Sequence, residues 1–408
     1  MVPFHVLIDQ AKSNIMSDEE EGNIMARYNP VLDALPTYPQ QALNQRKAQV
    51  RAQGKILYDF GVGDPIEPVP EFIRNALKEA IPPHCGYPSV RGTQEFRESV
   101  VGYVKRRYGT VLDPDVHVVP VSGAKEAVFH APMLFVDPQA EDRYVLFPDP
   151  GYPAYYRGAK FAGGIPHPVP LSGDYVFRPW TLPEELLQKT RIIWLNSPHN
   201  PSGVSMSRED LQKTVDICQK YNIVCISDET YADIYDTEPP ASLLEGDLTN
   251  VLVIHSLSKR SGMTGYRSGF VAGDPEIMQQ LIRFRANPGL VPQTFVTKAA
   301  TLAWSDDEHV AKRRALFSKK KALFLSFFDQ QGWEFFGREA SLYLWLRVPT
   351  EQNGEEYAIE LLNLGIVVSP GSMFAITDAG SNYVRLAMVP DIEGCVEAIK
   401  IWSKHIQP

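Results

Sequence analysis

Residues 191–228 read RIIWLNSPHNPSGVSMSREDLQKTVDICQKYNIVCISD, and this stretch carries the pattern that decides the fold. RIIWLN (191–196) is a short apolar run with β-branched residues, which is typical of a buried strand. A helix is predicted over 207–221, because Ser207 can cap its start and its apolar residues recur at helical spacing. IVCIS (223–227) is the next apolar run, so the stretch predicts a strand, a helix and a second strand.

The same alternation continues along the chain. VLVIHS (251–256) and GFVAG (269–273) are further apolar runs that we interpret as strands. Strands that are apolar throughout and separated by helices favour a parallel sheet covered on both faces, with right-handed crossovers. The sequence therefore predicts an α/β fold in which ligands bind beyond the carboxyl ends of the strands.

The C-terminal part of the chain has a different pattern. A charged helix is predicted near 308–330, and the segments SLYLWLRV (341–348) and NYVRLAM (382–388) are predicted as strands. This pattern favours a smaller α+β domain, against which the start of the chain packs. The predicted division is a flexible lead-in over 1–28, an N-terminal segment over 29–63, a large domain over 64–300 and a small domain over 301–408.

The composition narrows the class of protein. The chain has 408 residues, 44% of them hydrophobic and 22% charged, with a formal net charge of −9. This ordinary globular mix has room for two domains, and its negative balance disfavours a nucleic-acid partner. No apolar run approaches the ~18 residues of a membrane span, and the N-terminus lacks the pattern of a secretory signal. The four cysteines form no C-x-x-C pair, so we expect a cytoplasmic protein with no metal site and no membrane partner.

Three polar clusters each follow a predicted strand: NSPHNPSG (196–203), SDETYAD (227–233) and SLSKRSG (256–262). Because the carboxyl ends of parallel strands meet at one edge of a sheet, we expect these clusters to form one site. SGAKEAV (122–128) also follows an apolar run and opens a helix, where backbone N–H groups can bind an anion. A simple helix cap is the alternative for this segment, and no complete nucleotide-binding glycine motif occurs.

Lys259 and Asp228 stand at the ends of neighbouring predicted strands. Alone, Lys259 is a solvated loop lysine, a phosphate-binding lysine or a covalent catalyst, and Asp228 forms a salt bridge or opposes a protonated ring nitrogen. Ser256, Ser258 and Arg267 together could hold a dianionic phosphate. Pyridoxal 5′-phosphate requires an amine that reacts with its aldehyde, a carboxylate that pairs with its ring nitrogen, and a binding site for its phosphate.

Six segments strengthen this interpretation by occurring together and in order: PDPGYPAY (148–155), NSPHNPSG (196–203), SDETYAD (227–233), HSLSK (255–259), GYRSGF (265–270) and NYVRLAM (382–388). From about Asn29 to near the C-terminus, the chain resembles the fold-type-I, class I/II pyridoxal-phosphate aminotransferases. The resemblance implies a mainly parallel seven-stranded sheet sandwiched by helices, and a smaller α+β domain. It also implies pyridoxal 5′-phosphate as cofactor and ping-pong transfer of an amino group between amino and keto acids. A carbon–sulfur lyase on the same cofactor is the alternative reaction.

The resemblance implies a role for each matching residue. Lys259 would bind the cofactor's aldehyde covalently and later move a proton, and Asp228 would pair with the ring nitrogen. Tyr231 and Asn200 would hydrogen-bond the 3-oxygen of the ring, and Tyr152 would stack on the ring. The phosphate would be held by Gly123, Ala124 and Lys125 at a helix start and by Ser256, Ser258 and Arg267.

Three further matches concern the substrate and the assembly. Arg385 resembles the family's arginine for the substrate carboxylate, which a guanidinium binds in a bidentate manner, with Gly63 and Asn200 beside it. Tyr87 resembles the tyrosine that reaches the phosphate of the neighbouring subunit, which implies a homodimer with shared active sites. No clear match exists for the second arginine of dicarboxylate-specific family members, which disfavours an aspartate-specific enzyme.

Local stretches narrow the resemblance further. The segments 29–48, 61–77, 255–274 and 341–348 are similar to bacterial N-succinyldiaminopimelate aminotransferases. This similarity implies an enzyme of lysine biosynthesis that exchanges an amino group between glutamate/2-oxoglutarate and N-succinyl-LL-2,6-diaminopimelate. LL-diaminopimelate aminotransferases and broad-specificity aspartate or aromatic aminotransferases share these motifs and are the alternatives.

Overall fold

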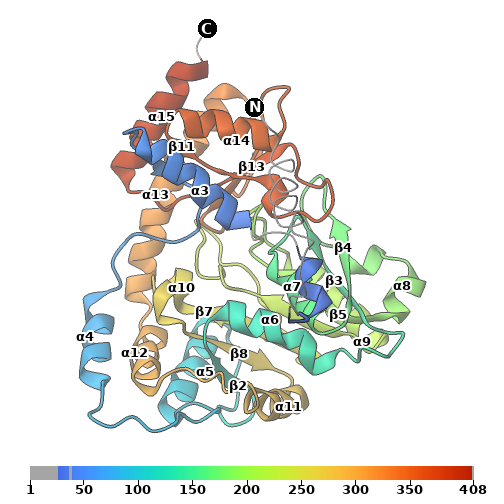
Figure 1. Ribbon diagram of the computed structural model, residues 1–408. Coiled ribbons are helices and arrows are strands. Elements are labelled where there is room, and N and C mark those ends of the chain that lie inside the picture. Colours follow the sequence, from blue (N-terminus) through green and yellow to red (C-terminus); the bar gives the residue numbers. More distant parts are fainter. Residues whose placement is uncertain (1–25, 36–38, 407–408) are drawn as a thin grey trace.

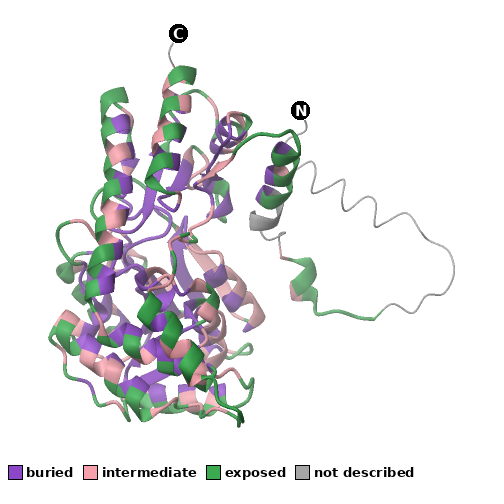
Figure 2. Cartoon of the chain, turned by 90° about the vertical axis from the view of Figure 1, so that its left-hand side faces the viewer, coloured by how far each residue is buried: buried purple, intermediate pink, exposed green. Residues whose placement is uncertain are grey.

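The computed structural model describes residues 26–35 and 39–406 (Figure 1). Most of the predicted lead-in over 1–28, namely residues 1–25, lies outside the described residues. The described chain forms a large central sheet, a four-stranded sheet built from the C-terminal part, and a two-stranded sheet. The two-stranded sheet pairs residues 58–59 with residues 366–367. Buried residues are concentrated in the strands and exposed residues on the outer helices (Figure 2).

The central sheet has seven strands in the order β2-β8-β7-β6-β5-β3-β4. They are β2 (Val118–Val121), β3 (Tyr144–Asp149), β4 (Ile165–Pro170), β5 (Thr190–Asn196), β6 (Val224–Asp228), β7 (Val251–Ser256) and β8 (Gly269–Gly273). All neighbours are parallel except the pairs that β8 makes with β2 and β7. The prediction of a mainly parallel seven-stranded sheet is therefore confirmed.

Strand β8 departs from the parallel pattern expected of its apolar sequence. The connection from β7 to β8 holds only two short helices, α10 (Leu257–Arg260) and η3 (Thr264–Tyr266). Such a connection turns the chain back beside β7, whereas parallel neighbours are usually joined by a longer crossover helix that packs on a face of the sheet. The return places Lys259 and Arg267 on one short connection that begins at the carboxyl end of β7.

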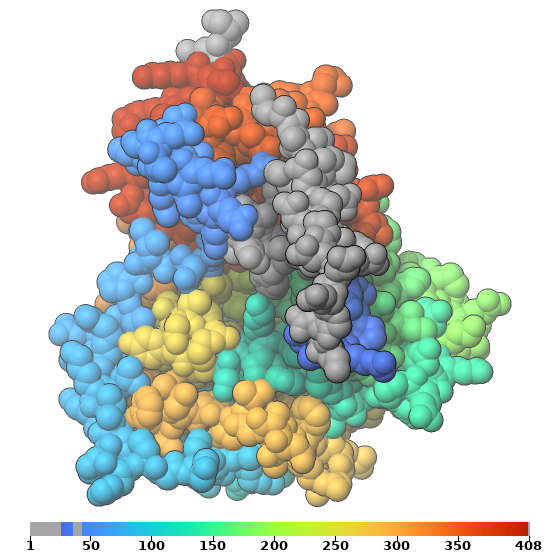
Figure 3. All heavy atoms as spheres, viewed as in Figure 1, coloured from blue at the N-terminus to red at the C-terminus, as the bar shows by residue number. Residues whose placement is uncertain are grey.

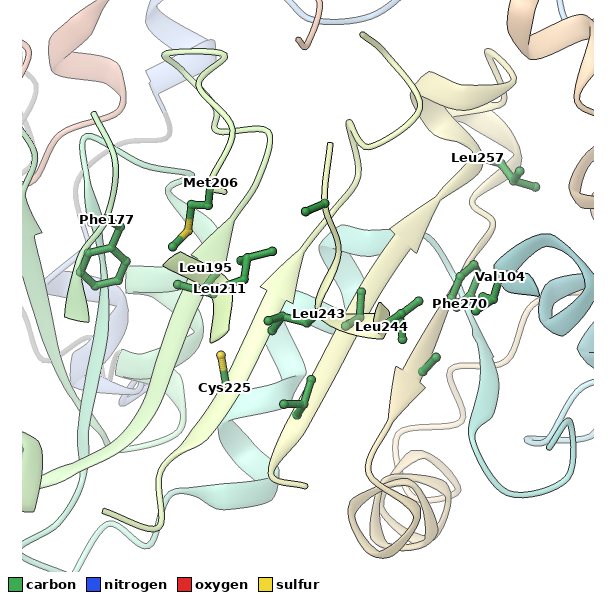
Figure 4. Packing of buried hydrophobic residues seen from close by; sticks show 14 of the residues in the cluster. Val104, Phe177, Leu195, Met206, Leu211, Cys225, Leu243, Leu244, Leu257 and Phe270 are labelled. Carbon is green, nitrogen blue, oxygen red and sulfur yellow. The ribbon is translucent and has the colours of Figure 1, made fainter. Parts of the chain in front are cut away.

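Both faces of the sheet are covered. Alternate residues of β5 point to opposite faces, so Leu195 lies in one core and Trp194 in the other. Figure 4 shows Leu195 near Leu211 and Cys225 in the first core. Helices α4 (Glu71–Ala80), α5 (Gln94–Tyr108), α9 (Arg208–Lys220) and α12 (Thr294–Ser305) pack into that core, while α6 (Ala124–Phe135), α7 (Ala154–Phe161) and α11 (Pro275–Arg285) pack into the second. Helix α9 begins as predicted, since the Ser207 hydroxyl accepts the backbone N–H of Asp210 at 3.1 Å.

The C-terminal part forms an antiparallel sheet with helices. Its strands are β9 (Phe335–Phe336), β10 (Tyr343–Arg347), β12 (Ser369–Pro370) and β13 (Tyr383–Ala387), in the order β12-β13-β10-β9. Helices α13 (Glu308–Gln331), α14 (Gly354–Asn363) and α15 (Ile392–Ile406) accompany them. Figure 1 shows α13 running from the central sheet to this smaller sheet. The predicted strands 341–348 and 382–388 thus correspond to β10 and β13, which pair along their whole length.

The start of the described chain joins the C-terminal part. Strand β1 (Tyr58–Asp59) pairs in parallel with β11 (Ile366–Val367), and α3 (Pro39–Ala52) lies beside α14 (Figures 1 and 3). The pairing brings the segment after β1, which includes Gly63, to the junction between the two sheets. The remaining helices of the described residues are short: α2 (Pro30–Asp33), α8 (Glu184–Gln188), and the 3-10 helices η1 (Pro179–Thr181), η2 (Leu243–Glu245) and η4 (Gly371–Met373). Across residues 26–35 and 39–406, no helix is long and apolar enough to cross a membrane.

Candidate active site

A cavity of about 400 Å³ lies at the carboxyl ends of β5, β6 and β7. The start of α6 forms another part of its wall, and β10 and β13 of the smaller sheet close it from the opposite side. The predicted site residues that line it are Gly63, Ala124, Lys125, Tyr152, Asn200, Asp228, Tyr231, Ser256, Ser258, Lys259, Arg267 and Arg385. Loops far apart in the sequence therefore meet at one edge of the parallel strands, as the strand pattern predicts.

Lys259 carries an amine in this cavity that is largely removed from water. Its Nζ donates a hydrogen bond to the backbone carbonyl of Gly63. Burial lowers the pKa of Lys259 to about 8; Asp64 opposes this shift, and the positive charges of Arg385 and Arg267 add to it. Because the neutral amine is then populated near neutral pH, it can act as a nucleophile or as a base.

Asp228 is a buried carboxylate at the end of β6, with only 5% of its surface exposed. The Thr230 hydroxyl donates to its Oδ1 at 2.6 Å, and the Tyr155 hydroxyl donates to its Oδ2 at 3.1 Å. Burial raises the pKa of Asp228, and these hydrogen bonds lower it in part. Its near partners are thus neutral donors, and a cation placed beside this carboxylate would be strongly favoured.

The opposite end of the cavity presents donors for an anion. Gly123 has a φ of +84°, and a Cβ there would lie 2.6 Å from Nη2 of Arg267. Glycine at this position therefore lets the guanidinium reach the start of α6, where backbone N–H groups also attract negative charge. Ser256 donates its hydroxyl to Ser258 at 3.0 Å and accepts the Ser258 N–H at 3.1 Å, which keeps both hydroxyls together at the cavity.

Arg385 is held as a fixed planar fork inside the cavity. Its Nη1 donates to Oδ1 of Asn200 and its Nη2 to the backbone carbonyl of Gly61, both at 2.8 Å. The guanidinium lies over the rings of Tyr343 and Phe374, at 4.2 and 4.4 Å from their centroids. Each terminal nitrogen keeps a second hydrogen, so this geometry suits a carboxylate ligand.

Three predicted site residues have less specific surroundings. Tyr152 lines the cavity and meets Tyr155 edge-to-face, with ring centroids 5.8 Å apart. Lys125 lines the cavity in the first turn of α6. Tyr87 is fully exposed and lies outside the lining of this cavity, so its predicted role in a neighbouring subunit stays a prediction.

Several residues of the site were not predicted. Tyr343 lies on β10, and its hydroxyl is 3.0 Å from that of Tyr231. Asn196 donates to the backbone carbonyl of Asp228 at 2.8 Å and accepts the N–H of Asn200 at 2.7 Å. Asn196 ends the predicted strand 191–196, so its position at the carboxyl end of a strand could have indicated that it belongs to the site. Tyr343 has no comparable signal, because it reaches the cavity through the packing of the smaller sheet.

The fold and the arrangement of a half-buried lysine, a buried carboxylate and an anion cradle at one sheet edge are those of a transaminase. The chain belongs to the class I and II aminotransferase family, whose profile matches residues 55–400.

Named relatives and solved structures agree with this membership. The LL-diaminopimelate aminotransferase of Aquifex aeolicus is 35% identical over 383 residues, which cover 92% of this chain and 98% of that protein. The substrate-bound structure of BacF from Bacillus subtilis is 26% identical and superposes with a TM-score of 0.88, over 94% of this chain and 99% of that one. A probable N-succinyldiaminopimelate aminotransferase from Thermus thermophilus is 26% identical, with a TM-score of 0.84 over 90% of this chain and all of that one.

Proposed function

We propose that this aminotransferase uses pyridoxal 5′-phosphate to move an amino group between LL-diaminopimelate and 2-oxoglutarate. The observation that carries the cofactor is the placement of three features around one cavity: the amine of Lys259, the carboxylate of Asp228, and the guanidinium of Arg267, which approaches the start of α6 at Gly123. The residues fit the group, because an aldehyde, a pyridine nitrogen and a phosphate each meet the chemistry they require.

In this proposal each residue has a defined task toward the cofactor. Lys259 holds the aldehyde, Asp228 opposes the ring nitrogen, and Asn200 and Tyr231 hold the 3-oxygen. Tyr152 would lie against the ring, and the phosphate would be held by Gly123, Ala124, Lys125, Ser256, Ser258 and Arg267. When bound, the cofactor withdraws electrons from the substrate's Cα and makes its proton labile.

The chain's own residues then orient the substrate and move the proton. Arg385 binds the α-carboxylate through its fork, which holds the Cα–H bond in one orientation. The free Nζ of Lys259 would take the proton from Cα, as its lowered pKa allows near pH 8. The carbonyl of Gly63 accepts a hydrogen bond from that nitrogen and limits its positions.

The named relatives favour LL-diaminopimelate over the succinylated substrate that the local sequence similarity implies. The relative from Aquifex aeolicus named for LL-diaminopimelate is 35% identical, whereas the Thermus thermophilus structure named for the succinylated compound is 26% identical. The two substrate hypotheses require the same cofactor and the same carboxylate-binding arginine. They differ at the far end of the substrate, where one carries a free amine and the other a succinyl amide.

The working form in this proposal is a homodimer. Tyr87 is fully exposed and lies outside the cavity of its own chain. A large aromatic residue so placed can contribute its hydroxyl to the phosphate site of a second subunit. Sedimentation of the cofactor-loaded protein should give a dimer, and Tyr87→Phe should weaken cofactor binding without dissociating that dimer.

A panel of amino donors tests the substrate. With 2-oxoglutarate as acceptor, glutamate formation is measured for LL-diaminopimelate, N-succinyl-LL-diaminopimelate, aspartate and phenylalanine, with Lys259→Ala as the control. We expect kcat/KM for LL-diaminopimelate to exceed each other value by roughly tenfold or more, the lower end of the discrimination that differences in pocket contacts supply. A higher value for the succinylated donor would restore that reading, and turnover of neither diaminopimelate form would exclude both.

A further inference from the structure

Tyr343 occupies a position that the proposed roles leave without a task. It lies on β10 of the smaller sheet, is 2% exposed, and lines the cavity opposite the central sheet. Its side chain touches both the proposed cofactor side, through Tyr231, and the proposed substrate side, through Arg385. We infer that Tyr343 is a positioning residue whose hydroxyl orients Tyr231 and whose ring supports Arg385; this inference rests on the proposed function.

The direction of the Tyr343–Tyr231 hydrogen bond follows from the surroundings of the two hydroxyls, which are 3.0 Å apart. Each hydroxyl has a single hydrogen to donate. Within the described chain, the Tyr343 hydroxyl has Tyr231 as its hydrogen-bond partner, so donation by Tyr231 would leave a buried hydrogen of Tyr343 unpaired. Donation by Tyr343 avoids this cost and leaves the hydrogen of Tyr231 free to point at a ligand acceptor.

The hydroxyl of Tyr343 is fixed from a second side by Gly63. A Cβ at Gly63 would collide with the Tyr343 hydroxyl, so the two residues are in tight contact there. The carbonyl of the same glycine accepts the hydrogen bond of Lys259. Gly63 therefore contacts both the Tyr343 hydroxyl and the Lys259 amine, and its lack of a side chain leaves room for the hydroxyl beside Tyr231.

A donated hydrogen bond also changes the strength of the next one. When Tyr343 donates to the oxygen of Tyr231, the Tyr231 hydroxyl becomes a better donor, because hydrogen bonds in a chain polarise one another. A better donor to the 3-oxygen of the cofactor stabilises negative charge on that oxygen. This stabilisation lowers the pH at which the bound cofactor loses its proton.

The ring of Tyr343 has a separate effect. The guanidinium of Arg385 lies 4.2 Å from its centroid and is 5% exposed, so a cation–π contact forms in a desolvated place. Substitutions can therefore separate the two functions of Tyr343. Phenylalanine keeps the ring and removes the hydroxyl, whereas leucine removes both.

The test uses the cofactor-loaded protein without substrate and follows its visible absorption as a function of pH. For Tyr343→Phe we expect the midpoint to rise by roughly 0.1 to 0.6 of a pH unit, because the loss of the donor to Tyr231 weakens the next hydrogen bond by roughly 10–30%. The KM for glutamate should stay within about twofold in this variant. In Tyr343→Leu the KM should rise about 3- to 30-fold, as expected for a lost buried cation–π contact.

Tyr357→Phe is the matched control, because Tyr357 is a buried tyrosine whose hydroxyl accepts Trp402 Nε1 at 3.0 Å outside the cavity. It should leave the midpoint and KM at wild-type values. An unchanged midpoint in Tyr343→Phe, with wild-type protein that binds the cofactor and titrates, would overturn the inference alone. A wild-type protein that binds no cofactor would instead overturn the proposed function.

Discussion

Two parts of the cavity, one at Asp228 and one at Arg267, differ in how far their charged side chains are buried. At one end, Asp228 is buried and already hydrogen-bonded by Thr230 and Tyr155. At the other end, Arg267 is exposed and reaches the start of α6 only because Gly123 has no side chain. Water and salt screen the buried charge of Asp228 poorly, so we expect it to act mainly on the rate of the reaction. The exposed charge of Arg267 is well screened, so we expect it to act mainly on the affinity for the cofactor. Substitutions at the two ends should therefore have different signatures.

The largest effect is expected from Lys259, which lines the same cavity. Lys259→Ala removes both the amine that we propose holds the aldehyde and the base that we propose moves the proton. We expect glutamate-dependent turnover to fall by roughly 10³-fold or more. Cofactor retained by the phosphate end should still be detectable by its absorbance after gel filtration. Turnover within tenfold of wild type would show that another group moves the proton.

The next largest effect is expected at the buried end. Asp228→Asn keeps the shape and removes the charge, so kcat should fall by roughly 10²- to 10³-fold, the range measured for lost electrostatic stabilisation. The thermal midpoint of the cofactor-free protein should not fall at neutral pH, because burial raises the pKa of this carboxyl and its charged form is costly there. An unchanged kcat with weaker cofactor binding would show that Asp228 contributes to cofactor affinity and not to the rate of the reaction.

At the exposed end the expected change is in affinity. Gly123→Ala pushes against the Arg267 guanidinium and strains a φ of +84°, so the dissociation constant of pyridoxal 5′-phosphate should rise roughly 10-fold. The rise should shrink at high salt, where the arginine contributes less. Gly109→Ala is the matched control, with a φ of +75° and no atom within 4 Å of its added Cβ. An equal loss of affinity in both variants would mean that only backbone strain matters.

The smallest effect concerns the pH dependence of covalent capture. The pKa of Lys259 is lowered by burial to about 8, so its amine becomes neutral as the pH rises through that value. The rate at which the cofactor-free protein captures pyridoxal 5′-phosphate should rise about fivefold from pH 7 to pH 8 and level off above about pH 9. A rate that continues to rise tenfold per unit up to pH 10 would indicate a solvated lysine with an ordinary pKa.

The sequence predicted the parts of the fold and site that depend on local pattern. Apolar runs located the central strands, and the residues that directly follow them, including Asp228 and Lys259, line the cavity. These positions were predictable because the carboxyl ends of parallel strands share one edge. The pairing direction of β8 was not, because it depends on how the short connection 257–268 turns back.

Residues that reach the site from elsewhere were harder to predict. Tyr343 enters the cavity because the smaller sheet packs across the strand ends, and no local pattern encodes that packing. Tyr155 contacts Asp228 because its ring stacks on Trp194 in the core beneath, with centroids 4.9 Å apart. Both are ordinary core tyrosines by pattern, and only tertiary contacts distinguish them.

Reduction of the cofactor-loaded protein with sodium borohydride, followed by peptide mass mapping, tests the covalent assignment most directly. The cavity is lined by two lysines of the described chain, Lys125 and Lys259, so the experiment has a built-in competitor. The half-buried amine with the lowered pKa should carry the tag, and we expect a single modified peptide that contains Lys259. A tag on Lys125, or protein that carries no tag after cofactor loading, would contradict the assignment.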